Sequence, residues 1–161
     1  MAIENVKAFL REHGLEERVH EFDSSSATVA LAAEALGTQP ARIAKTLSFE
    51  NGDACILIVA AGDAKIDNRK FKDLFGRKAS MLPPDEVLRL TGHAVGGVCP
   101  FALPEGTAQV YTDISLQRFE TVYPAAGSSN SAVELSCEEL FSLSGSCGWI
   151  DVCKGWQEET T

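Results

Sequence analysis

The segment of residues 92–101 (GHAVGGVCPF) contains the residues whose types and spacing most favour chemistry. Its adjacent glycines, Gly96 and Gly97, permit positive φ angles and let a ligand approach the main chain closely. Pro100 fixes its own φ angle and favours an extended conformation at the residue before it. Such a loop can present consecutive N–H groups to a carbonyl or phosphate oxygen. A tight turn that binds no ligand has the same composition.

Cys99 and His93 in this segment raise a second possibility, a cysteine-dependent hydrolase. A catalytic thiol needs a base within hydrogen-bonding reach and a lowered pKa. Cys99 follows His93 by six residues, a spacing that does not ensure contact. A buried structural thiol is therefore the favoured interpretation of Cys99.

Two further segments contain candidate site residues. Lys45 is expected where a short helix that starts at Pro40 meets a strand that starts at Thr46. A lysine there can neutralise the helix C-terminus, or it can direct a cation into a cleft to hold a phosphate or polarise an ester. Residues 126–135 (AGSSNSAVEL) supply hydroxyls and an amide that suit the rim of a pocket and equally suit an ordinary loop.

Several familiar chemistries lack their sequence signatures. The three histidines (His13, His20 and His93) are far apart, and Cys147 and Cys153 have no third ligand at a standard spacing. The sequence contains no Walker loop, no dinucleotide-binding glycine motif and no G-x-S-x-G element. We therefore predict that the protein uses neither a metal nor another cofactor.

Length and composition indicate a single domain spanning residues 1–161 in the cytoplasm. The apolar fraction of 45% and charged fraction of 23% are typical of a globular protein. The longest apolar run, residues 54–61, is far shorter than the roughly 20 residues of a membrane-spanning helix, so no membrane association is expected. The five cysteines are an odd number without C-x-x-C spacing, and no signal peptide is recognisable, which favours a reducing compartment.

The net charge of −9 argues against a broad nucleic-acid-binding surface, but its distribution is uneven. Six basic residues in the window 65–78 face only two acidic ones, which gives this window a charge of 6 − 2 = +4. The basic residues are Lys65, Arg69, Lys70, Lys72, Arg77 and Lys78. This window is either a solvated helix face or a patch that meets a few phosphates.

Periodicity and turn residues predict an α+β fold. Helices are expected over residues 3–10, 29–36, 40–45, 68–75, 84–90, 115–119 and 136–143. Strands are expected over residues 46–50, 55–60, 94–98, 109–113, 121–123, 132–135 and 149–152. An Asn51-Gly52 turn between the first two strands predicts a hairpin.

Taken in order, these segments resemble the YbaK-like aminoacyl-tRNA deacylases, which include the editing domain inserted in, or standing beside, bacterial prolyl-tRNA synthetase. The residues that match the opening signature are Thr28-Val29, Ala32-Ala33, Leu36-Gly37 and Ile43-Ala44-Lys45-Thr46-Leu47. Gly96 to Phe101 match the G-x-x-x-P loop of the family, whose ends are Gly96 and Pro100. Asp113 and Ser115-Leu116 match a D-x-S-L element, and residues 126–135 match the last block. The resemblance thus runs from about Thr28 to Val152.

The resemblance implies a single-domain, mostly antiparallel, barrel-like mixed sheet surrounded by short helices. It also implies hydrolysis, in trans and without a metal, of the ester that joins a wrong amino acid to transfer RNA. The expected substrate is a small amino acid on the tRNA for proline or a related tRNA. Lys45 would hold the terminal phosphate or the ester region, Gly96 and Gly97 would donate N–H groups to the ester carbonyl, and Pro100 would fix the loop.

The remaining expectations concern binding. The substrate-binding residues implied by the resemblance are Thr28, Cys99, Phe101, Gly127, Ser128 and Asn130. Glu134 stands where some relatives carry a histidine. The expected partners are the acceptor end of an aminoacylated tRNA, contacted on electrostatic grounds by Lys65, Arg69 and Lys70, and an aminoacyl-tRNA synthetase. The alternative is a non-catalytic module of the same fold that binds aminoacyl-tRNA or a synthetase.

Overall fold

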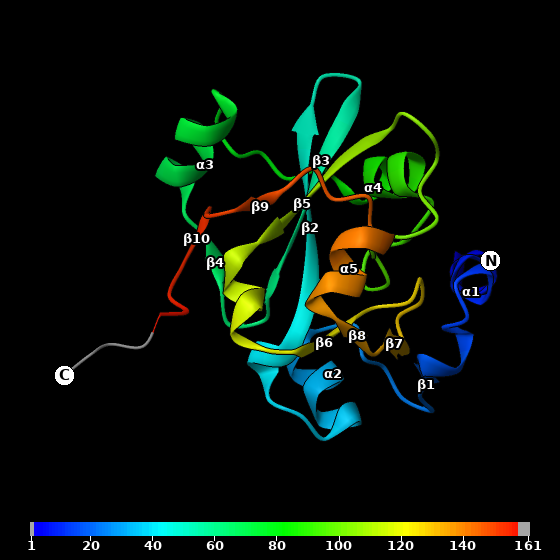
Figure 1. The fold of residues 1–161 in the computed structure, drawn as a ribbon. Coiled ribbons are helices and arrows are strands. Elements are labelled where there is room, and N and C mark those ends of the chain that lie inside the picture. The colour runs from blue at the N-terminus through cyan, green and yellow to red at the C-terminus, as the bar shows by residue number, and fades with distance from the viewer. Residues whose placement is uncertain (1, 158–161) are drawn as a thin grey trace.

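A curled mixed sheet runs through the centre of the molecule, with short helices around it (Figure 1). The computed structural model describes residues 2–157. Six strands lie in the order β8-β6-β2-β3-β5-β9. Their bounds are β2 (Ile43–Asn51), β3 (Ala54–Ala61), β5 (Ala108–Asp113), β6 (Thr121–Pro124), β8 (Leu135–Ser136) and β9 (Trp149–Ile150). Two smaller sheets pair β1 (Val19–Glu21) with β7 (Ser131–Val133) and β4 (Lys65–Ile66) with β10 (Cys153–Lys154).

The helices lie on different sides of the sheet in Figure 1, with α3 across from α1 and α4, and α2 at the lower end. The α-helices of the described residues are α1 (Ala2–Glu12), α2 (Val29–Leu36), α3 (Asn68–Phe75), α4 (Pro84–Thr91) and α5 (Cys137–Leu143). Short 3-10 helices are η1 (Glu16–Arg18), η2 (Pro40–Arg42) and η3 (Ile114–Arg118). Across residues 2–157, none of these helices combines the length and apolar character needed to cross a bilayer.

The hairpin predicted from Asn51-Gly52 is confirmed. Strands β2 and β3 pair antiparallel from Ala44 opposite Ala61 to Asn51 opposite Ala54, and Gly52 takes a φ of 66° in the turn. Strand β3 is buried over nearly its whole length because β2 and β5 flank it and other elements cover both faces. A continuous apolar run is typical of such a central strand.

Capping residues explain the ends of three of the helices. The Thr28 side chain accepts a hydrogen bond from Leu31 N at 3.2 Å and starts α2, which Gly37 ends at a φ of 68°. The Asp67 side chain caps α3 in the same way, and Gly92 ends α4. The helices predicted at 29–36 and 68–75 therefore have the expected bounds.

Two local predictions were wrong. The helix expected over 40–45 ends at Arg42, and Lys45 lies inside β2, opposite Ala60 of β3. Pairing with β3 extends β2 beyond the point where the local pattern places its start. Residues 94–98 form a loop and no strand, because Gly96 has a φ of 98° and Gly97 N–H donates to Ala94 O at 3.0 Å, which closes a turn.

The predicted α+β class is confirmed. Four of the seven strand pairs in residues 2–157 are antiparallel. The other three are parallel, and all of these lie in the six-stranded sheet. This mixed sheet curls into a half-barrel, whose strand β2 carries Lys45.

Candidate functional site

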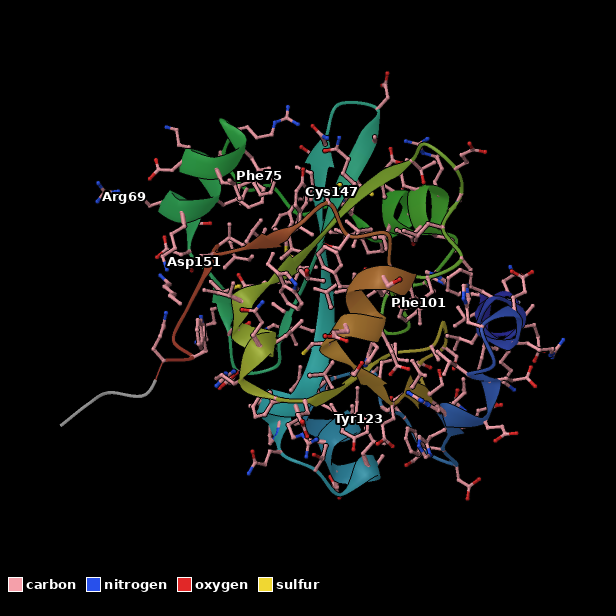
Figure 2. The ribbon with its side chains drawn as sticks, in the orientation of Figure 1. Arg69, Phe75, Phe101, Tyr123, Cys147 and Asp151 are labelled. Carbon is pink, nitrogen blue, oxygen red and sulfur yellow. The ribbon has the colours of Figure 1, made fainter. Side chains whose placement is uncertain are left out.

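A cavity of about 410 Å³ lies between β2, α2, the start of α4 and the loop of residues 92–101. Three of the residues predicted to be catalytic or substrate-binding line it: Thr28, Lys45 and Gly96. Most of the remaining wall is apolar, and Tyr123 contributes from β6, where it packs against α2 (Figure 2). Segments that are distant in sequence thus meet at one hollow.

Lys45 is the one charged side chain among the residues that line this cavity. Its Nζ donates hydrogen bonds to Ala64 O and, at 3.4 Å, to Gly62 O. Burial lowers the pKa of this ammonium group, while Cys153 and Asp63 oppose the change and Lys65 adds to it. The main chain after β3 therefore fixes the position of the cation, and its partial burial reduces the screening of its charge by solvent.

Gly62 has a packing role beside Lys45. A Cβ atom at this position would lie 2.1 Å from Pro40 O and 2.6 Å from Val29 Cγ1. Glycine alone permits this approach of η2 and α2 to the end of β3. The carbonyl that accepts from Lys45 is thus held by close contact on its other side.

The opposite wall of the cavity is main chain from the loop 92–101. Gly96 faces the cavity, and no acceptor for its N–H lies within residues 2–157. Gly97 is buried and donates its own N–H to Ala94 O, so of the N–H groups expected around Gly96 and Gly97 that of Gly97 is already engaged within the loop. A Cβ atom on Gly97 would lie 2.7–2.8 Å from main-chain atoms of Ser128. Gly97 therefore sets how closely the loop packs. The N–H groups of Val95, Gly96 and Val98, which line the cavity, make no hydrogen bond within the described residues, and Gly96 is the candidate donor among them.

The second half of this loop is buried beneath the first. His93 Nε2 lies 2.7 Å from Phe101 O and 3.5 Å from Cys99 Sγ, and both side chains are at most 1% exposed. His93 Nδ1 is buried without a hydrogen-bond partner in the described residues. Burial lowers the pKa of His93 and raises the pKa of Cys99 to about 12. Cys99 and His93 do meet, but this environment keeps the thiol protonated.

The buried half of the loop does not form the cavity wall. Cys99 and Phe101 are absent from the lining, as is Pro100, which is also buried. Phe101 packs instead against Phe9 of α1, with ring centroids 6.1 Å apart. The prediction that Cys99 and Phe101 contact a substrate directly is not supported by this geometry, because their side chains support the loop from behind.

Residues 127–130 also lie behind the cavity. Gly127 has a φ of 96°, and a Cβ atom added to it would lie 3.0 Å from main-chain atoms of Ala2. The chain thus passes close to the start of α1 at this point. Ser128 Oγ donates to Asn130 Oδ1 at 2.8 Å and lies 2.7 Å from Ser131 Oγ, whose hydroxyl can donate to it, and Asn130 Nδ2 donates to Phe22 O at 3.0 Å. Only the last residue of this network, Ser131, lines the cavity. Gly127, Ser128 and Asn130 therefore shape the support on which the loop rests.

Glu134 does not take part in the site, because its residue is exposed and lies outside the cavity lining. Its main-chain N–H donates to Arg18 O at 3.3 Å, beyond the end of β7. No acid or base at this position faces the cavity.

The basic residues of the window 65–78 lie outside the cavity. Lys65 is exposed on β4, next to the Ala64 carbonyl that Lys45 contacts. Arg69 points away from α3 into solvent (Figure 2). Lys70 is partly neutralised, because its Nζ donates to Asp151 Oδ1 at 3.0 Å and to Cys153 O at 3.2 Å. Lys65 and Arg69 are thus the more available cations of the three.

The cavity can attract an oxygen anion or a polarised carbonyl. A fixed ammonium stands at one wall and a main-chain N–H at the other, and its lining contains no carboxylate. Residues 2–157 contain no cluster of three or more histidine, cysteine or acidic side chains that could hold a metal ion.

Sequence reasoning missed the apolar part of the wall. Residues of this kind include Met81, Val87 and Val95, which come from α4 and the segments on either side of it. The amphipathic pattern of α4 indicates only which face is buried, and nothing in it distinguishes a cavity wall from solid core.

Comparisons with known proteins agree with this geometry. The aminoacyl-tRNA editing domain family matches residues 23–143 of the chain. The uncharacterized protein YwhH of Bacillus subtilis (strain 168) is 55% identical over 158 residues, which cover 98% of this chain and 100% of that protein.

Solved structures share the fold over almost the whole chain. The crystal structure of hypothetical protein APE2540 is 31% identical, covers 93% of this chain and 99% of that chain, and superimposes with a TM-score of 0.81. A protein proposed to be a trans-editing enzyme for prolyl tRNA synthetase is 28% identical, with coverages of 96% and 98% and a TM-score of 0.85. The resemblance drawn from the sequence is confirmed, and the chain belongs to the YbaK-like family of aminoacyl-tRNA editing domains.

Proposed function

We propose that this protein is an aminoacyl-tRNA deacylase, which hydrolyses in trans the ester between a wrongly attached amino acid and the terminal ribose of a tRNA. The observation that carries the proposal is the pairing of Lys45 and the Gly96 main chain across one cavity. Water adds to the ester carbonyl, and the ribose oxygen leaves with a proton as the free amino acid forms. The protein's own contribution is to orient the ester and to stabilise the developing negative charge.

The two walls have separate tasks in this reaction. Lys45 attracts the terminal phosphate or the ester region, and the Gly96 N–H donates to the carbonyl oxygen as it gains charge. Pro100 and Gly97 act through the loop, since neither lines the cavity. Thr28 borders the same hollow, with its hydroxyl engaged in capping α2. The protein's groups supply these effects without a metal.

The preferred acyl group is small and uncharged. The apolar wall and the absence of a lining carboxylate disfavour a cationic side chain, while a few buried hydroxyls such as Ser48 and Ser131 tolerate a polar atom. One methylene changes selectivity by only about 1–3 kcal/mol, so neighbouring small amino acids compete. Alanine, serine, cysteine or 2-aminobutyrate on the tRNA for proline, or on a related tRNA, fits this description.

Deacylation of these four misacylated tRNAs tests the proposal. Wild type should release one of the amino acids, and Lys45→Ala should lower kcat/KM by at least about 100-fold, as loss of one electrostatic contact to a transition state does. Lys72→Ala is the matched control, because this lysine is exposed on α3 outside the cavity. No turnover by wild type, with tRNA binding intact, would favour the non-catalytic binding module instead.

Acceptor-stem contact is proposed for Lys65 and Arg69, with a smaller contribution from the ion-paired Lys70. A few neutralised phosphates give weak binding that declines with salt. Arg69→Gln should reduce tRNA affinity severalfold, whereas Arg11→Gln, which removes the same charge from α1, should not. Equal affinities of the two variants would remove this assignment. The overall charge of −9 favours delivery of the substrate by a synthetase partner in the cytoplasm.

A further inference from the structure

Two exposed apolar side chains stand at the edge of the cavity. Among the large hydrophobic residues that the structure describes, Val95 is 62% exposed and Met81 is 60% exposed, the highest values found. Both line the cavity. The other exposed members of this class, Leu31, Leu74 and Leu88, do not line it. The largest exposures of apolar side chains thus coincide with the mouth of the proposed site.

The backbone that carries these two side chains is well anchored. Met81 forms an isolated antiparallel bridge with Phe49 of β2, and Leu82 N donates to Ser48 O at 3.2 Å. Val95 lies in the turn closed by Gly97 N–H and Ala94 O, directly before Gly96. Both side chains are therefore held in solvent by ordered main chain, at a cost in exposed apolar surface.

The connectivity of the substrate decides what lies against this rim. When the ester is between Lys45 and Gly96, the amino acid occupies the cavity and the ribose stands at its mouth. The base attached to that ribose then lies toward the opening, beside the residues that surround it. A purine has apolar faces that pack on aliphatic and thioether groups, and methionine is especially adaptable in such contacts.

We infer that Met81 and Val95 form a binding surface for the base of the terminal nucleoside of the tRNA, an inference that rests on the proposed deacylase function. These two side chains, here called the rim, bind the purine face through apolar contact, and Lys45 and Gly96 make the polar contacts to the ester. A docked protein is a poorer match, because stable interfaces bury about 1,200–2,000 Å² in total and two side chains supply a small part of that area.

Substitutions of Met81 and Val95 test the inference without disturbing the core, because both side chains are exposed. Met81→Ser and Val95→Ser should each raise KM for the misacylated tRNA about five- to tenfold, as expected for loss of one apolar contact, with kcat within about twofold. Met81→Leu should restore most of the affinity. Leu88→Ser is the control, because Leu88 is also 52% exposed, lies on α4 and is outside the cavity lining. Unchanged KM in both rim variants, or an equal rise in the control, would overturn the inference.

Binding of adenosine alone separates this inference from the proposed function. Within residues 2–157 Met81 is the single methionine, so methyl-labelled methionine gives an NMR probe at the rim. Adenosine should shift the Met81 methyl signal, whereas ribose 5-phosphate should leave it unchanged. Failure of wild type to deacylate any tRNA would refute the function, while an unperturbed Met81 signal at millimolar adenosine would refute the rim.

Discussion

The two walls that face each other across the cavity are built in different ways. Strand β2 presents Lys45 from a ladder of eight residue pairs with β3, so its position follows from regular hydrogen bonding. The loop 92–101 presents Gly96 without a strand, and depends on the close packing of Gly97 and on the buried hydrogen bond of His93. The Lys45 side chain is thus positioned by regular strand pairing, whereas the Gly96 main chain is positioned by a few specific contacts. Single substitutions should therefore damage the loop wall more than the strand wall.

The largest structural effect is expected from Gly97→Ala. Its new Cβ would lie under 3 Å from the Ser128 main chain, so loop and support must separate. We expect a loss of about 2–3 kcal/mol in the free energy of unfolding, measured by urea titration, and at least a tenfold fall in kcat/KM. Gly148→Ala is the matched control, since an added Cβ there has no heavy atom within 4 Å. Equal free energies of unfolding in the two variants would show that the loop 92–101 can move away from Ser128 at little cost, against this expectation.

His93 gives the next largest effect. His93→Leu leaves the buried Phe101 carbonyl without its donor, which costs about 1–3 kcal/mol of stability. The loop then loses its anchor near Gly96, so kcat should fall several-fold while KM changes little. His93→Gln carries an amide donor of similar reach and should recover most of both losses. A Gln variant as impaired as the Leu variant would show that His93 contributes packing alone.

Acid should weaken the loop wall selectively. Because burial lowers the pKa of His93, the folded protein keeps this side chain neutral at pH values where the unfolded chain, with a pKa near 6.5, is already protonated. The unfolded state then binds more protons, so the free energy of unfolding decreases as pH falls below about 6.5, on the order of 1 kcal/mol from this residue. Comparison with His93→Gln in the same urea series isolates the effect from that of the carboxylates. If the free energy of unfolding depended on pH in the same way in wild type and His93→Gln, this expectation would be contradicted.

The smallest effect is expected at Cys99, although it lies beside His93. The pKa of about 12 keeps its thiol protonated at neutral pH, so Cys99→Ser should leave turnover within about threefold of wild type. A mild alkylating reagent should modify the exposed Cys147 first, as peptide mass spectrometry can show. Loss of activity in Cys99→Ser at unchanged stability would revive the cysteine-hydrolase alternative.

Prediction from sequence succeeded where local signals and tertiary structure agree. Asn51-Gly52 placed the hairpin, and periodicity with turn residues placed α2 and α3, whose observed caps are Thr28 and Asp67. Such turns and helix ends are specified by nearby residues. Lys45 was predicted at the end of a short helix and lies instead inside β2, since pairing with β3 decides where β2 begins. Such a pairing joins residues that are distant along the chain and leaves no local trace.

The candidate site was predicted in part for the same reason. The glycine and proline spacing identified the loop 92–101. Of the matched residues 96–101, Gly96 and Val98 line the cavity. Sequence alone could not separate residues that line the cavity from those that support it, because both belong to one motif. Met81 carries no signal at all, since its exposure depends on the bridge to Phe49.

The contacts of Lys45 bear on how this protein can change during evolution. Both acceptors of its ammonium are main-chain carbonyls, at Gly62 and Ala64, so no side-chain substitution removes them directly. Gly62 is the exception that must stay small, because Pro40 O would lie 2.1 Å from any Cβ there. Apolar wall residues such as Val29 and Val87 can therefore be exchanged to suit a different acyl group while the cation keeps its place. The preferred acyl group can therefore change during evolution while the position of the Lys45 ammonium group stays the same.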